Sequence, residues 1–76
     1  MKVNVLFFGC VAQMTGVMRM EVSAGDTDQL RDEIARQFPS LKKMPFAIAL
    51  NQDIIQYNTP LNENDEVAFL PPFAGG

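Results

Sequence analysis

The sequence contains no histidine, and Cys10 is its only cysteine. Ser/His/Asp and Cys/His nucleophile arrangements are therefore excluded, because each depends on an imidazole base. Zinc, haem and iron–sulfur sites require several imidazole or thiolate ligands, so we predict no metal site. A lone cysteine cannot form a disulfide within the chain, and the absence of a disulfide framework favours a reducing, cytoplasmic location.

Positive charge is also scarce, with 6 basic residues against 9 acidic ones and a formal net charge of -3. Only Lys42 and Lys43 are adjacent. No basic stripe is therefore present to neutralise a nucleic-acid backbone, and no nucleic-acid partner is expected. No apolar run approaches the roughly 20 residues of a membrane span, so no membrane partner is expected.

The length of 76 residues leaves room for one small domain. Hydrophobic residues make up 47% and charged residues 20% of the chain, which is typical of globular proteins. The core of so small a domain is thin, so a roomy enclosed active site is not expected. We predict a single domain over residues 1–76 with a flexible tail over residues 71–76, and we expect function to reside at a surface or a terminus.

The hydrophobic pattern predicts the element order β-β-α-β-β-β, which is an α+β fold with a mixed sheet. An apolar, β-branched run predicts a buried strand over residues 3–8, and alternation predicts a half-exposed strand over residues 17–22 that pairs with it as an antiparallel hairpin. The segment 9–16 between them is expected to be a connection that is bounded by glycines and contains one helical turn. Three further strands are predicted over residues 46–50, 54–57 and 66–70.

One main helix is predicted between the second and third strands. Asp26 or Thr27 can cap its first turn, with Gln29 in the position of a capping box, and Pro39 ends it. The helix carries an apolar stripe that faces the sheet, and an exposed i,i+4 ion pair is expected between Asp32 and Arg36. The stripe consists of Leu30, Ile34 and Phe38.

One helix covers only one face of the sheet, so the other face is expected to be open. If the odd-numbered residues of segment 3–8 face the helix, Leu6 and Phe8 face away, and Leu70 and Ile54 join them on the outer face. Scattered apolar surface residues are the ordinary alternative. A contiguous patch for a protein partner is favoured, because both strands carry surplus apolar residues at the same parity.

The last six residues, Pro71-Pro72-Phe73-Ala74-Gly75-Gly76, suggest a chemical role for the C-terminus. Two terminal glycines occur by chance in about one chain in 200. Prolines prevent the tail from continuing the sheet, six extended residues span about 20 Å, and glycine backbone passes through a narrow channel. A partner that adenylates the terminal carboxylate would make it reactive toward a thiol, a persulfide or an amine.

The residues also resemble a known family. The opening Val5-Leu6-Phe7-Phe8, the turn Asn51-Gln52 and the segment 61–76, which reads Leu-Asn-Glu-Asn-Asp-Glu-Val-Ala-Phe-Leu-Pro-Pro-Phe-Ala-Gly-Gly, are similar to ubiquitin-like β-grasp sulfur carriers. The resemblance covers the whole chain and is strongest to the small subunits of molybdopterin synthase. It implies a ubiquitin-like β-grasp fold with one main helix packed on one face of the sheet.

The resemblance also implies a function. An E1-like partner would use ATP to adenylate the Gly76 carboxylate, next to Gly75, and sulfur transfer would convert it to a thiocarboxylate. The tail would donate this sulfur to cyclic pyranopterin monophosphate in a heterotetramer with the large subunit. That subunit would hold the catalytic site, and this chain would bind no cofactor. The residues expected to contact the large subunit are Phe8, Ile54, Leu70, Pro71, Pro72, Phe73 and Ala74.

Two alternatives remain open at this point. The chain could carry sulfur for another pathway such as thiazole synthesis, although those carriers usually lack the Pro-Pro pair. It could also be a ubiquitin-like modifier joined to lysines through Gly76, or a plain interaction module. For Cys10 a structural role is favoured over a sulfur relay, and for Asp65 and Glu66 a turn is favoured over an acid pair, because adjacent strand residues face opposite ways.

Overall fold

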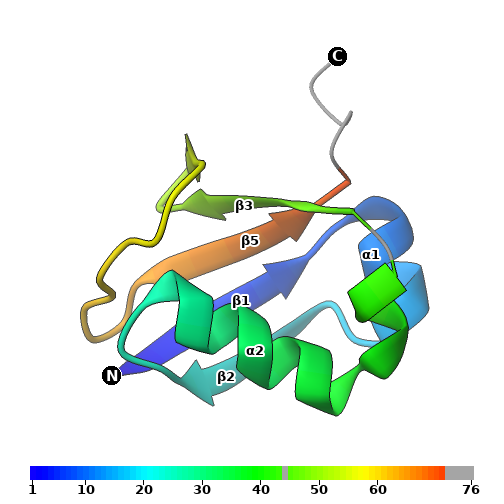
Figure 1. Cartoon of the computed structure of the whole chain (residues 1–76), viewed down its shortest axis with the longest axis horizontal. Helices are drawn as coiled ribbons and strands as arrows, with labels where there is room; N and C mark the ends of the chain where they lie inside the picture. Colours follow the sequence, from blue (N-terminus) through cyan, green and yellow to red (C-terminus); the bar gives the residue numbers. More distant parts are fainter. Residues whose placement is uncertain (44, 72–76) are drawn as a thin grey trace.

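A computed structural model describes residues 1–43 and 45–71 of the chain. Its five strands form one sheet in the order β2-β1-β5-β3-β4 (Figure 1). The central strands β1 and β5 are parallel, and all other neighbours are antiparallel. The strands are β1 (Lys2–Phe7), β2 (Arg19–Ser23), β3 (Ala47–Leu50), β4 (Asp53–Ile55) and β5 (Glu66–Leu70).

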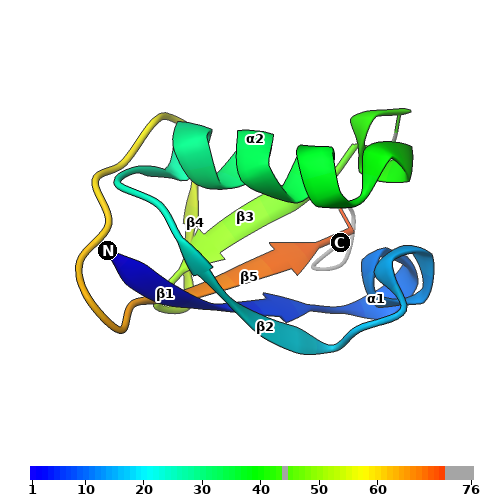
Figure 2. The same cartoon turned by 90° about the horizontal axis from the view of Figure 1, so that it is seen from below.

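Three helical segments connect the strands: α1 (Gly9–Thr15), α2 (Thr27–Gln37) and the 3₁₀ helix η1 (Pro39–Lys43). Figure 2 shows α2 lying across one face of the sheet, with α1 at the end where β1 finishes. This arrangement confirms the predicted α+β fold with one main helix on one face. Among the described residues, no helix is both long enough and apolar enough to cross a membrane.

The core lies between α2 and the inner face of the sheet. Val3, Val5 and Phe7 of β1 point into it and are at most 1% exposed, as the alternation of this strand predicts. The Phe7 ring packs edge-on against the Phe38 ring, with 5.9 Å between the ring centroids. The centroid of the Phe7 ring also lies 5.6 Å from that of the Phe69 ring. Residues of the opposite parity, including Leu6 and Ala68, therefore point to the outer face.

The start of α2 is fixed by hydrogen bonds that the sequence predicts in part. Asp26 is the N-cap, and its carboxylate accepts a 2.8 Å hydrogen bond from the Gln29 N–H. The Gln29 side-chain oxygen accepts a 2.9 Å bond from the N–H of Gly25, one residue before the cap. In a capping box the Gln29 side chain would accept this bond from the N–H of the N-cap residue Asp26, so the observed acceptor bond lies one residue earlier than predicted. The helix ends before Pro39, as expected.

The ion pair predicted between Asp32 and Arg36 is wrong. Arg36 instead donates to both carboxylate oxygens of Glu33 at 2.6 Å, and Gln37 donates to the same carboxylate at 2.8 Å. Residues that are three or four positions apart are neighbours on the surface of a helix, and here the Glu33 carboxylate accepts hydrogen bonds from both Arg36 and Gln37. These hydrogen bonds, that from Arg36 above all, hold the pKa of the Glu33 carboxyl below its usual value.

The segment after β1 is more ordered than predicted. It forms the helix α1 instead of a connection with one turn, because Val11 is fully buried and ties the segment to the core. Gly16 ends this helix with a φ of 76°, and its N–H donates to the Ala12 carbonyl at 2.9 Å. A Cβ added at Gly9 would lie 2.9 Å from Pro71 Cγ, so the beginning of the tail lies directly against α1.

Replacing Asp26 with Ala is expected to lower the free energy of unfolding by about 1 kcal/mol, because the Gln29 N–H loses its acceptor. Urea denaturation measures this change. Asp32→Ala is the matched control, since Asp32 is an exposed acid on the same helix and surface changes of this kind usually cost less than about 0.5 kcal/mol. Equal losses in the two variants would contradict the capping role of Asp26.

Candidate docking site on the open face of the sheet

The outer face of the sheet carries a shallow groove of about 290 Å³ that spans four strands. Across this face, Leu6 of β1, Ala68 of β5, Ala49 of β3 and Ile54 of β4 are successive neighbours in the strand register. The two alanines form a low floor in the centre, and the larger side chains on either side form the walls. The groove is lined by Leu6, Phe8, Ala49, Gln52, Ile54, Glu66, Ala68 and Leu70.

The structure brings together three of the seven residues that the sequence predicts for partner binding. Phe8, Ile54 and Leu70 all line this groove, together with Leu6. Phe8 is 47% exposed and Ile54 is 56% exposed, so both present apolar surface to solvent. Exposed apolar residues that gather in one groove are typical of a protein-binding surface.

The groove leads to the C-terminal tail. Leu70 is the last residue of β5 and lines the groove, and the half-buried Pro71 follows it. The N–H of Phe8 donates to the Phe69 carbonyl at 3.1 Å, which holds the Phe8 wall beside this exit. The predicted tail residues Pro72, Phe73, Ala74, Gly75 and Gly76 lie outside the described residues.

Four lining residues were not identified as site residues from the sequence. Ala49 and Ala68 supply the floor, and Gln52 and Glu66 supply the polar side chains among the described residues of the lining. Gln52 lies in the turn between β3 and β4, and Glu66 begins β5. Small residues at outward-facing positions of central strands are the sequence feature that could have identified the two alanines as part of the site.

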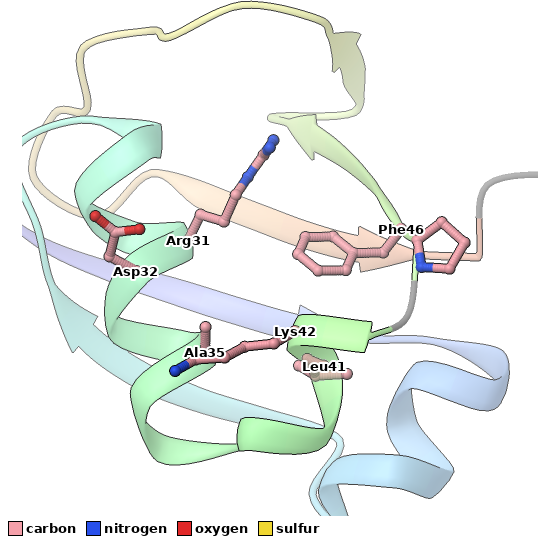
Figure 3. A pocket seen from close by; sticks show the side chains of 7 residues that line it. Arg31, Asp32, Ala35, Leu41, Lys42 and Phe46 are labelled. Carbon is pink, nitrogen blue, oxygen red and sulfur yellow. The ribbon is translucent and has the colours of Figure 1, made fainter.

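A second groove lies between α2 and the segment that leads into β3 (Figure 3). The Arg31 guanidinium lies 5.6 Å from the centre of the Phe46 ring, and that ring packs 5.0 Å from Phe69. Figure 3 shows Asp32 pointing away from Phe46. Arg31 therefore has a structural partner, and the described residues of this lining include no nucleophile paired with a base.

Two other reactive side chains, those of Asp65 and Cys10, show no contacts with the described residues that indicate a catalytic role. The Asp65 carboxylate accepts bonds from Asn51 Nδ2 at 3.1 Å and from the Asn62 N–H at 2.8 Å. Asp65 therefore organises the turns around β5, as expected, and is not half of an acid pair with Glu66. Cys10 is half-buried in the first turn of α1. In the part of the chain that the structure describes, no cluster of three or more His, Cys, Asp or Glu residues could hold a metal ion.

Comparison with known proteins identifies close relatives over nearly the full length. The sequence profile of the ThiS family matches residues 5–76. The chain is 40% identical over 81 residues to a molybdopterin synthase sulfur carrier subunit from Mycobacterium tuberculosis, with 99% of this chain and 98% of that protein covered. These matches confirm the resemblance that the sequence motifs indicate.

Solved structures show the same fold. The structure of a protein–protein complex of subunits 1 and 2 of molybdopterin-converting factor from Helicobacter pylori contains a chain that is 37% identical, with a TM-score of 0.75 and 100% of both chains covered. Small archaeal modifier protein 1 from Methanosarcina acetivorans has a TM-score of 0.84 at 22% identity, covering 99% of this chain and 96% of that chain. At that identity the likeness concerns the fold alone, and it confirms the predicted ubiquitin-like β-grasp.

Proposed function

Because the chain belongs to the ThiS family, we propose that it is the sulfur carrier subunit of a molybdopterin synthase. The observation that carries this proposal is the groove on the open face of the sheet, whose lining includes Leu70, the residue directly before Pro71. A large subunit bound in this groove lies where the tail begins. Six residues in a fully extended conformation would span about 20 Å, which is long enough to enter a site in that subunit.

The chemistry resides in the terminal carboxylate and in the partners. A carboxylate is a poor electrophile, so an E1-like partner first joins the Gly76 carboxylate to the AMP portion of ATP and releases pyrophosphate. Attack by hydrosulfide displaces AMP and leaves a thiocarboxylate directly, whereas attack by a persulfide displaces AMP and leaves an acyl disulfide, whose S–S bond a thiol then reduces to give the thiocarboxylate and a new disulfide. We place this activation in the cytoplasm. The described residues of this chain offer no histidine base, and the catalytic site is assigned to the large subunit.

The groove has the shape and polarity for a protein partner. Phe8 and Ile54 are exposed and Leu70 is half-buried, and all three offer apolar contacts beside an alanine floor that admits an apolar side chain of the large subunit. Residues 71–74 then direct the tail toward the site where cyclic pyranopterin monophosphate receives sulfur. Gly75 and Gly76 have no Cβ and fit a narrow entrance. Two such small subunits on a dimer of large subunits would form the heterotetramer.

Intact-mass measurement of the protein purified from its own cells tests this function. The proposal expects a fraction in which one oxygen at Gly76 is replaced by sulfur, located by fragmentation of the C-terminal peptide. The same species should form in vitro with the activating enzyme, ATP and a sulfur donor, and ATP omission is the control. Lysine-linked conjugates through Gly76 would support a modifier instead, and an unmodified terminus under all conditions would refute a sulfur carrier.

A further inference from the structure

The turn between β3 and β4 has an unusual backbone for its sequence. Asn51 has a φ of 49° and Gln52 a φ of 76°, and the flanking residues Leu50 and Asp53 pair directly. A two-residue hairpin loop with positive φ at both positions is a type I′ turn, which strongly favours Asn followed by Gly. A glutamine in the left-handed region is disfavoured by the contact between its Cβ and the following carbonyl.

Asn51 has contacts that explain its place, whereas Gln52 has none. The Asn51 side chain donates to Asp65 Oδ1 at 3.1 Å and accepts from the Glu66 N–H at 3.0 Å, which ties the turn to β5. The Gln52 side chain is exposed and forms no hydrogen bond with any other described residue. It lines the outer-face groove. No contact of the Gln52 side chain within the described residues therefore stabilises the fold, and glycine would adopt this backbone conformation with less strain.

Glu66 lies at the same end of the groove. Its backbone N–H is bonded to Asn51, which places it beside the turn, and its half-exposed side chain also lines the groove. The other lining residues are apolar, and no lysine or arginine is among them. The groove thus has one polar end, made of an amide and a carboxylate, and an apolar remainder.

We propose that Gln52 and Glu66 form a polar lip that binds a lysine or arginine side chain of the large subunit. The inference rests on the proposed function and adds the chemistry that fixes how the partner lies in the groove. The amide and carboxylate oxygens both accept hydrogen bonds, and an ammonium or guanidinium group offers several donors. Apolar contacts alone set no register along the groove, whereas a charged hydrogen bond at one end does.

Gln52→Gly separates the strain of the turn from the role of the side chain. The melting temperature is expected to rise by roughly 2–6 °C, because glycine relieves the left-handed strain. Affinity for the purified large subunit, measured by calorimetric titration, is expected to fall by about 10-fold with the loss of one charge-assisted bond. Glu66→Gln should weaken binding by a similar factor and make the affinity less dependent on salt.

Asn64→Gly is the matched control. Asn64 also has a positive φ, of 68°, and is exposed, but it does not line the groove. Asparagine tolerates the left-handed region better than glutamine does, so this variant should gain less stability than Gln52→Gly, and it should bind the large subunit like the unmodified chain. Unchanged affinity in Gln52→Gly would overturn the lip, as would an equal loss of affinity in Asn64→Gly. Failure of the unmodified chain to bind the large subunit would instead overturn the proposed function, and the lip with it.

Discussion

Deletion of Gly76 is expected to reduce molybdopterin formation to below about 1% of the unmodified level, because the shortened tail withdraws the reactive carbonyl by about 3.5 Å. A misplacement of even 1 Å at a reacting centre can cost about 100-fold in rate. The melting temperature should not change, since β5 and its buried residues Val67 and Phe69 end before the tail. A synthase assay reconstituted with the large subunit measures the first effect, and thermal unfolding measures the second.

Two controls separate loss of chemistry from loss of docking. The shortened chain keeps every residue that lines the outer-face groove, so its affinity for the large subunit should fall only by the contribution of the tail. Gly76→Ala retains the length of the chain but adds a Cβ, and it should impair transfer if the entrance is narrow. Normal cofactor formation by the shortened chain would refute a mechanism that depends on the terminal carboxylate.

Much of the fold is predictable because local patterns and burial agree. The alternation along β1 and β5 indicates which residues face the helix, and the structure buries Val3, Val5, Phe7, Val67 and Phe69 accordingly. Helix α1 was underestimated because its stability is tertiary: the segment has no side-chain cap and depends on the burial of Val11.

The candidate site was predictable only in part. Parity along the strands places Phe8 and Leu70 on the outer face, but the order of strands in the sheet is a long-range property. Ala49 and Ala68 become one floor only because β3 and β5 pair, and Leu6 adjoins them only because β1 lies on the other side of β5. The polar lip was missed because the strain at Gln52 is a property of the folded backbone.

Phe8→Arg is expected to weaken binding of the large subunit by about 30- to 1000-fold, which corresponds to roughly 2–4 kcal/mol for loss of an aromatic contact that contributes strongly to an interface. Phe8 forms a wall of the groove, so arginine there would place an unpaired charge against apolar surface. The domain should still fold, because the Phe8 side chain is 47% exposed and its structural bond to Phe69 uses the backbone.

Met18→Arg tests whether this loss belongs to the groove. Met18 is an apolar residue that is 77% exposed and lies outside the groove lining, so the variant has the same change in net charge on another surface. The affinity of Met18→Arg for the large subunit should match that of the unmodified chain. In Phe8→Arg, the rate of Gly76 adenylation should change less than the affinity for the large subunit does. Because both variants add one positive charge, equal losses would mean that net charge, and not the Phe8 wall, controls docking.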